Sequence, residues 1–215
     1  MKIMKRNIAA LSISLALALA PFHTVAAAET SKQSHSMDDP AGQLHCALRK
    51  HWIEHVFWTR SYIVSAVANL PDKEEVLERL LKNQDDIGKA IEPYYGEKAG
   101  KQLAELLREH ILLAGSVLEA AKEGNEENLK KFNAQWYKNA DDIALFLSKA
   151  NPNWSFDELK DLLYMHLAFV TEQVTTRIKQ DWAAEINSFD EGEDHIIKLA
   201  DTLTKGILQQ FPSKF

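Results

Sequence analysis

The chain has 215 residues, of which 31 are Asp or Glu and 25 are Lys or Arg, so its formal net charge is −6 at pH 7. Three of the basic residues lie within the first six positions. From residue 29 onward the chain therefore carries 22 basic against 31 acidic residues, a net charge of −9. Nucleic acids and anionic membranes are bound mainly through basic patches. The composition thus argues against a nucleic-acid partner, and the length suits a single domain.

The N-terminus has the pattern of a secretory signal. Lys2, Lys5 and Arg6 precede an apolar run over residues 8–20, and small residues follow up to Ala28. The run is about 13 residues long, whereas a membrane-spanning helix needs about 20. We therefore predict a signal peptide over 1–28 with cleavage after Ala28. The mature protein is expected to be secreted or extracytoplasmic, without a stable membrane anchor.

The remaining chain divides into a polar leader and a helical domain. Residues 29–40 contain almost nothing apolar and are expected to be a flexible leader. Over 41–215, apolar residues recur at intervals of three and four, and turn-forming residues interrupt this helical period. We predict helices over 41–69, 72–92, 98–123, 126–149, 155–188 and 193–210. Sequences typical of capping boxes start two of them, at Asp72 to Glu75 and at Ser155 to Glu158. Short connections then predict an all-α fold, a six-helix bundle of three antiparallel αα-hairpins.

An internal repeat supports the three hairpins. When the segment 82–110 is aligned with 138–166 without a gap, nine positions carry identical residues in both. In the first segment these are Lys82, Asn83, Asp85, Asp86, Ile87, Leu103, Leu106, Leu107 and His110. Weaker copies extend the repeat to both ends, with Leu48 aligned to Leu107 and Lys82 to Lys198. The repeats are then about 41–93, 98–149 and 155–211.

In this alignment each hairpin has a His on its first helix and an Asp on its second. The His residues lie within the apolar stripe and should point inward, while the Asp residues flank the core and could reach a neighbouring helix. One interpretation is that each buried His pairs with an Asp and holds the hairpins in register. The other is a metal centre for zinc, copper or iron, with the imidazoles as ligands. The residues concerned are His51, His110 and His166 with Asp85, Asp141 and Asp201.

The first predicted helix also contains an H-x-x-E-H run, formed by His51, Glu54 and His55. This run places two imidazoles one helical turn apart with a carboxylate beside them, as in one class of zinc peptidase. A metal-dependent hydrolase is therefore a further hypothesis, and His55 joins the candidate ligands. Cys46 is the only cysteine, so no internal disulfide can form.

Other catalytic motifs are missing from the sequence. There is no glycine-rich phosphate loop, no G-x-S-x-G elbow and no CxxC pair. We therefore expect a binding protein rather than an enzyme, with a metal ion as the leading ligand. The alternative is a structural or protein-interaction module with an extracellular protein partner. Arg60 and Arg177 are expected to form surface or inter-hairpin ion pairs.

Several runs resemble an uncharacterised family of small exported helical proteins of Gram-positive bacteria. The resemblance covers essentially all of the chain after the leader, and some relatives carry the name glycosyltransferase. It implies the same domain boundaries and assigns no catalytic residues. The runs that carry it are Trp58-Thr59-Arg60, Arg79 to Gly88, Pro93-Tyr94-Tyr95-Gly96, Trp136 to Ile143, Asn151-Pro152-Asn153-Trp154 and Gln210-Phe211-Pro212.

Overall fold

The computed structural model describes residues 39–215, and helices fill almost all of this part of the chain. The elements are α1 (Pro40–Ala68), α2 (Lys73–Tyr95), α3 (Glu97–Glu123), α4 (Glu126–Ala150), α5 (Phe156–Ile178), α6 (Trp182–Gln210) and the short 3-10 helix η1 (Pro212–Lys214). Within these residues there is no strand, so the predicted all-α fold with six helices is confirmed. The predicted signal peptide and nearly all of the leader lie outside the described residues.

Side-chain caps explain where several helices begin. Asp39 accepts a hydrogen bond from the backbone N–H of Gly42, and Pro40 fits the first turn of α1, where no N–H is needed. Ser155 accepts one from the backbone N–H of Glu158 at 3.4 Å, as the capping-box sequence predicts. Asp72 makes no such bond, so the cap predicted for α2 is wrong.

The connection between α5 and α6 lies about ten residues earlier than predicted. The sequence suggested a turn at residues 190–192, but the chain turns over residues 179–181 instead. Gln180 adopts a left-handed φ of 61°, and the Asp181 side chain accepts a hydrogen bond from the N–H of Ala184 to start α6. Gly192 lies inside α6, where a Cβ atom would come within 3.4 Å of Phe169 and Gln173 on α5. A Cβ atom at that distance makes an ordinary van der Waals contact, so Gly192 is a buried residue inside the helix and does not mark a turn.

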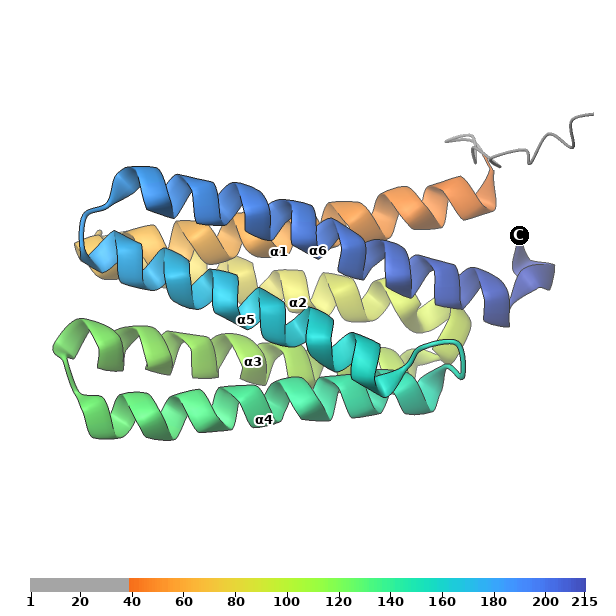
Figure 1. The fold of residues 1–215 in the computed structure, drawn as a ribbon. Helices are drawn as coiled ribbons and strands as arrows, with labels where there is room; N and C mark the ends of the chain where they lie inside the picture. Colours follow the sequence, from red (N-terminus) through yellow and green to blue (C-terminus); the bar gives the residue numbers. More distant parts are fainter. Residues whose placement is uncertain (1–38) are drawn as a thin grey trace, which may run out of the picture. The chain divides into compact units, whose positions relative to one another are not determined.

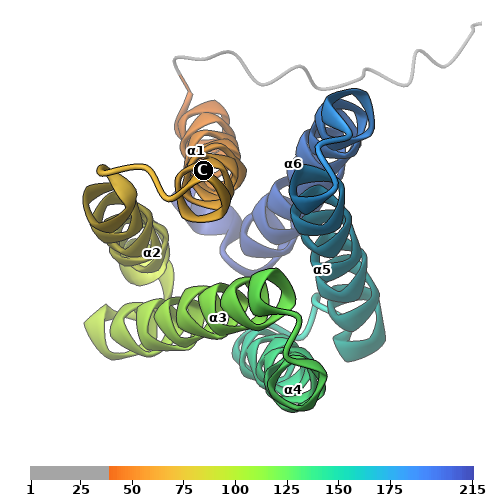
Figure 2. The same cartoon turned by 90° about the vertical axis from the view of Figure 1, so that its left-hand side faces the viewer.

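The three hairpins close into a ring of helices. α1 pairs with α2, α3 with α4 and α5 with α6, and α6 returns to pack along α1 (Figures 1 and 2). The first helix of each hairpin also contacts the first helices of the other two. The helices α1, α3 and α5 therefore meet along the centre, while α2, α4 and α6 alternate with them around the ring.

An ion-pair cluster fastens the last hairpin to the first. Glu185 on α6 is almost completely buried, and Arg60 on α1 donates to both of its carboxylate oxygens, at 2.7 and 3.0 Å. Arg177 on α5 approaches the same carboxylate at 3.6 Å. The inter-hairpin ion pair expected for Arg60 is confirmed, whereas Arg177 reaches a carboxylate of its own hairpin. A bidentate pair of this kind is directional, so it fixes how α6 lies against α1.

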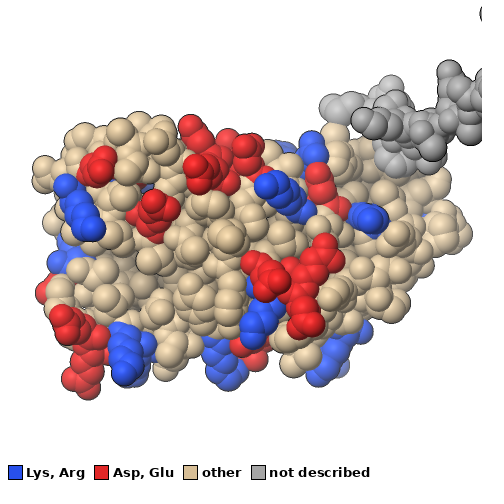
Figure 3. All heavy atoms as spheres, viewed as in Figure 1, with Lys and Arg blue, Asp and Glu red and all other residues tan. Residues whose placement is uncertain are grey.

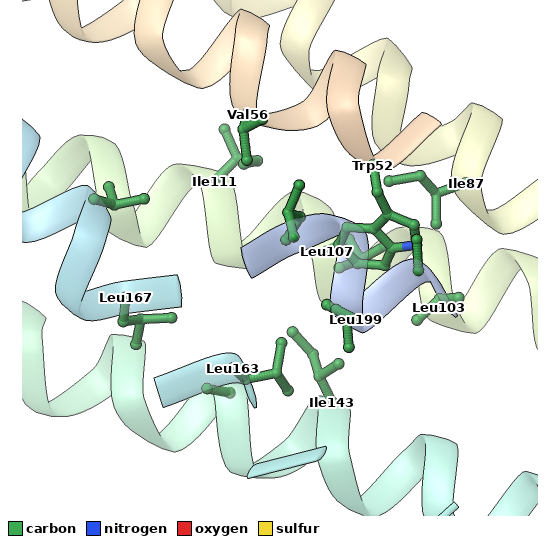
Figure 4. Close-up of a cluster of buried hydrophobic side chains, with 14 of the residues drawn as sticks. Trp52, Val56, Ile87, Leu103, Leu107, Ile111, Ile143, Leu163, Leu167 and Leu199 are labelled. Atoms are coloured by element: carbon green, nitrogen blue, oxygen red, sulfur yellow. The ribbon is translucent and has the colours of Figure 1, made fainter. Parts of the chain in front are cut away.

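Every helix contributes apolar side chains to one continuous core. Figure 4 shows part of it, including Trp52, Ile87, Leu107, Ile143, Leu163 and Leu199, one from each of α1 to α6. On the face drawn in Figure 3, acidic and basic groups are interspersed and much of the middle is uncharged. Across residues 39–215, no helix is both long enough and apolar enough to cross a bilayer.

Candidate functional site

Three buried imidazoles meet where the central helices come together. They belong to His55 on α1, His110 on α3 and His166 on α5, each no more than 3 % exposed. The ring centroids of His55 and His166 are 5.2 Å apart, and those of His110 and His166 are 6.2 Å apart. The Nε2 atoms of His55 and His166 are separated by 3.3 Å. Each hairpin thus supplies one imidazole from its first helix.

The second helix of each hairpin supplies a matching polar side chain at the same position of the repeat. Asn83, Asn139 and His195 each donate a hydrogen bond to a backbone carbonyl on the first helix of their own hairpin. The accepting carbonyl always lies four residues before the central His. These carbonyls belong to His51, Leu106 and Leu162, at 3.0, 3.1 and 2.8 Å respectively. The structural repeat therefore places His55, His110 and His166 in equivalent positions.

Both ring nitrogens of His110 have hydrogen-bond partners. The amide nitrogen of Asn139 donates to Leu106, so its Oδ1 is the acceptor that lies 2.8 Å from Nδ1 of His110. The indole N–H of Trp136 donates to Nε2 of His110 at 3.1 Å. His110 therefore carries its proton on Nδ1 and uses its Nε2 lone pair to accept from Trp136. Its imidazole is fully satisfied without any charged partner.

The imidazole of His55 is less completely satisfied. Its Nε2 faces His166, but its Nδ1 is buried without a hydrogen-bond partner among the described residues. Five further buried side-chain atoms among the described residues also lack a partner, and two of them are Oε1 of Gln84 and Nε1 of Trp52. The rings of Trp52 and His55 meet edge to face, with centroids 5.6 Å apart. Unpaired polar atoms in a core are rare and point to strain or to function.

Burial keeps the three central imidazoles neutral. Burial, and to a smaller extent His110, lower the pKa of His55 to about 3, while the nearby Gln84 side chain acts in the opposite direction. Burial lowers the pKa of His110 to about 4 against the opposing effect of Asn139. Burial and the neighbouring imidazoles hold the pKa of His166 well below 6.5. Neutral imidazoles retain the lone pairs with which His binds metals.

A small cavity lies one helical turn beyond the three imidazoles. Thr59, Ala114 and Val170, four residues after His55, His110 and His166, are among the residues that line it. Its volume is about 20 Å³, enough for roughly one water molecule. The cavity is mainly apolar, so it supplies space beside the centre but few hydrogen-bond partners. Its full lining is Thr59, Tyr62, Ile63, Leu80, Ile111, Ala114, Leu118, Val170 and Val174.

His51 does not take the place that the sequence alignment gave it. The weaker copy, which sets Leu48 on Leu107, equated His51 with His110, but His55, one turn later, occupies the equivalent position. His51 is half-buried, and its Nδ1 lies 3.7 Å from the carboxylate of Glu54. Of the four candidate His ligands, the structure therefore brings together His55, His110 and His166 and leaves His51 outside.

The predicted pairing of each His with an Asp of its own hairpin is wrong. Each Asp instead reaches the next hairpin around the ring, as its position flanking the core allows. Asp85 pairs with Arg108 on α3 at 3.5 Å, and Asp141 pairs with Lys160 on α5 at 3.1 Å. Asp201 accepts two hydrogen bonds from Arg49 on α1, at 2.7 and 2.5 Å. These carboxylates are partly exposed and tie hairpins together at the surface.

The H-x-x-E-H run is divided between surface and core. His55 points inward to His166, whereas Glu54 lies near Lys50 and Arg79, at 3.6 and 3.7 Å. The three groups of the motif therefore do not face one another around a common ion.

A surface groove of about 570 Å³ exists elsewhere, where α1 joins α2 and α3 joins α4, with Tyr62 and Glu119 in its lining.

Four residues of this centre were absent from the sequence-based set, namely Gln84, Trp136, Asn139 and His195. A signal for Asn139 was present, because it is one of the nine identical positions and aligns with Asn83. The weaker copy, which sets Lys82 on Lys198, puts Leu199 at this position and so misses His195. Trp136 and Gln84 have no counterpart in the other hairpins, so no repeat could mark them.

Within residues 39–215, no group of three or more His, Cys, Asp or Glu side chains is already arranged to hold a metal ion. The centre thus offers two facing nitrogen donors, with a third imidazole beside them. No family model, curated protein or solved structure matches the chain.

Proposed function

We propose that this is an exported binding protein for a late transition-metal ion, held between His55 and His166. The observation that carries the proposal is the 3.3 Å separation of their Nε2 atoms in the buried centre of the bundle. Metal–imidazole bonds are about 2.0–2.1 Å long. An ion at that distance from both nitrogens would subtend an N–metal–N angle of about 107°, close to a tetrahedral angle.

A third donor is available beside this pair. His110 lies next to His166, and its Nε2 lone pair is used only by the indole N–H of Trp136. A modest rotation of either ring would release this lone pair to the ion. The hydrogen bond from Trp136 therefore competes with metal binding, because the ion would replace it.

The donor set favours copper or zinc over iron. The residues that set the pKa values of the three imidazoles are other His residues, Gln84 and Asn139, and none is a carboxylate. Iron(II) sites of this general kind use two His and one carboxylate, whereas imidazoles alone suit copper and zinc. A centre made only of neutral donors also favours an ion of low charge, because burying uncompensated charge is costly. Cu⁺ and Zn²⁺ are the two ions to test.

The test is metal analysis of untagged protein purified without chelators and then offered Zn²⁺ or, under reducing conditions, Cu⁺. Stoichiometric metal should be bound by the wild type and lost in a His55→Leu, His166→Leu double variant. His51→Leu is the matched control, because His51 lies on the same helix outside the centre, and it should keep the metal. A wild type that takes up neither ion would overturn the proposal, as would metal retained by the double variant.

A protein-interaction module is the second candidate, favoured by one surface feature. Trp182 and Ile186 lie one turn apart at the start of α6, and each is nearly half exposed. The remaining large exposed apolar side chains, Phe57, Leu70, Leu112, Leu145 and Met165, are spread over other helices and a turn. A stable interface needs about 800 Å² on each partner, more than two side chains can offer. This candidate therefore ranks below the metal site.

A further inference from the structure

Gln84 lies on α2, next to the residue that anchors the first hairpin, and is completely buried. Its amide nitrogen donates to the carbonyl of Leu80 at 2.8 Å and to Oδ1 of Asn83 at 3.1 Å. Both amide N–H groups are therefore used, and turning the amide over would place its oxygen against two acceptors. The orientation of Gln84 is fixed, with Oε1 as the end that remains available.

That available oxygen is matched by an available nitrogen. Neither Oε1 of Gln84 nor Nδ1 of His55 has a hydrogen-bond partner within residues 39–215. Gln84 donates to Asn83, and Asn83 in turn binds the carbonyl of His51, one helical turn before His55, so the Gln84 amide lies at the level of His55 on the facing helix. We infer that Gln84 is a positioning residue that holds the proton of His55 on Nδ1 and thereby turns the Nε2 lone pair towards His166.

A rival arrangement involves Trp52. Its indole N–H is also buried without a partner, and it could donate to Nδ1 of His55, which would put the His55 proton on Nε2. In that arrangement Oε1 of Gln84 stays unpaired. Each arrangement leaves one buried polar atom without a partner, the Trp52 N–H in the first and Oε1 of Gln84 in the second. The second hairpin, where an amide oxygen accepts from Nδ1 of the equivalent imidazole of His110, favours the inferred tautomer.

The second hairpin shows the same arrangement already completed. There, Oδ1 of Asn139 accepts directly from Nδ1 of His110. In the first hairpin, Oδ1 of Asn83 accepts a hydrogen bond from the amide nitrogen of Gln84 instead. Gln84 therefore extends the chain of hydrogen bonds by one residue towards His55. A metal-binding His usually donates its second ring N–H to a fixed acceptor, which sets its tautomer. Gln84 would serve His55 in this way, so the inference deepens the proposed metal site.

The tautomer can be measured without any metal. Long-range ¹H–¹⁵N spectra of ¹⁵N-labelled, metal-free protein at pH 7.5 distinguish N–H from lone-pair nitrogens in each imidazole. The His55 resonances are identified by their loss in a His55→Leu variant. We expect Nδ1 of His55 to be the N–H nitrogen in the wild type. In Gln84→Leu, we expect the two His55 nitrogens to move towards averaged or exchanged positions, while His110 stays unchanged.

Gln173→Leu is the matched control, since it also replaces a buried glutamine, on α5, and should leave His55 as in the wild type. Wild-type protein with the His55 proton on Nε2 would overturn the inference, whether or not any variant folds. So would an unchanged His55 in Gln84→Leu.

Metal titration separates this inference from the proposed function on which its role rests. If the proposed site exists, Gln84→Leu should weaken binding of Zn²⁺ or Cu⁺ by about 10- to 100-fold, the usual effect of losing such an acceptor. The expected tautomer together with no metal uptake would overturn the proposed function and uphold the inference. Metal uptake of equal strength in both proteins would overturn the role of Gln84 while the metal site stands.

Discussion

His55 and His110 occupy equivalent positions in two copies of one hairpin, yet their surroundings differ. His110 has a partner on each ring nitrogen, Asn139 on one side and Trp136 on the other. Nε2 of His55 faces another imidazole, and its Nδ1 has no hydrogen-bond partner among residues 39–215. Equivalent positions of the repeat thus carry imidazoles with different hydrogen-bond partners. In the proposed metal site, these neighbouring side chains decide which imidazole is available to an ion.

Lowering the pH should destabilise the folded protein through both His55 and His110, and we expect this to be the largest effect on the free energy of unfolding. The pKa values of His55 and His110 are about 3 and 4 in the folded protein and near 6.5 when unfolded. The unfolded chain therefore binds more protons below pH 6.5, and stability falls as the pH falls towards the folded pKa values. Between pH 7 and pH 5 we expect a loss of about 4 kcal/mol from these two residues together.

Urea unfolding at the two pH values measures this loss, and His55→Leu should remove about half of it. The same free energy of unfolding at pH 5 and pH 7 would show that these imidazoles are not held neutral by the fold.

Removing the acceptor of His110 should have the next largest effect. Asn139→Leu leaves the Nδ1–H of His110 buried without a partner, and we expect a loss of about 3 kcal/mol in the free energy of unfolding. The exposed neighbour on the same helix gives the control, since Gln135→Leu should change stability by less than about 0.5 kcal/mol. Equal effects of the two substitutions would mean that Asn139 is not the partner on which His110 depends.

Trp136→Phe should make His110 resemble His55. It removes the indole N–H that occupies Nε2 of His110, at an expected cost of about 2 kcal/mol in stability. The freed lone pair should at the same time strengthen binding of Zn²⁺ or Cu⁺ in a competition titration. Weaker metal binding in this variant would argue against His110 as the third donor.

Substitutions of the surface carboxylates should have the smallest effect on the free energy of unfolding. Asp85 and Arg108 form a partly exposed pair at 3.5 Å, so Asp85→Asn should lower the free energy of unfolding by about 0.5 kcal/mol or less. Thermal unfolding at low and high salt measures this effect. A larger loss that persists at high salt would place Asp85 in the core network, contrary to its position.

The helical fold could be predicted because it rests on local signals. The apolar period and turns such as Asn151-Pro152-Asn153 place most helix ends within a few residues. The boundary between α5 and α6 was missed because its turn contains neither Gly nor Pro, while Gly192 lies within α6. The sequence alone does not distinguish a glycine in a turn from one inside a helix.

The candidate site could be predicted only in part, because helices can slide along their axes. The weaker copy matches Arg49 with Arg108, and each pairs with an Asp on a neighbouring second helix, although Arg108 lies one turn closer to the central His of its own helix. The same alignment selects His51, although His55 reaches the centre. Both His residues lie on one face of α1, and only the tertiary packing decides which turn meets His166. The sequence indicated inward-facing His residues, and the structure was needed to identify their partners.

The return of α6 to α1 also determines how the molecule comes apart. An open row of hairpins has two ends, each with a neighbour on one side only, and such arrays can fray from their termini. Here the Glu185–Arg60 contact and the Asp201–Arg49 contact join the last helix to the first, so the row has no terminal unit. Loosening any one hairpin exposes surfaces on both neighbours. Because the ring is closed, the three hairpins are expected to unfold together in one cooperative transition.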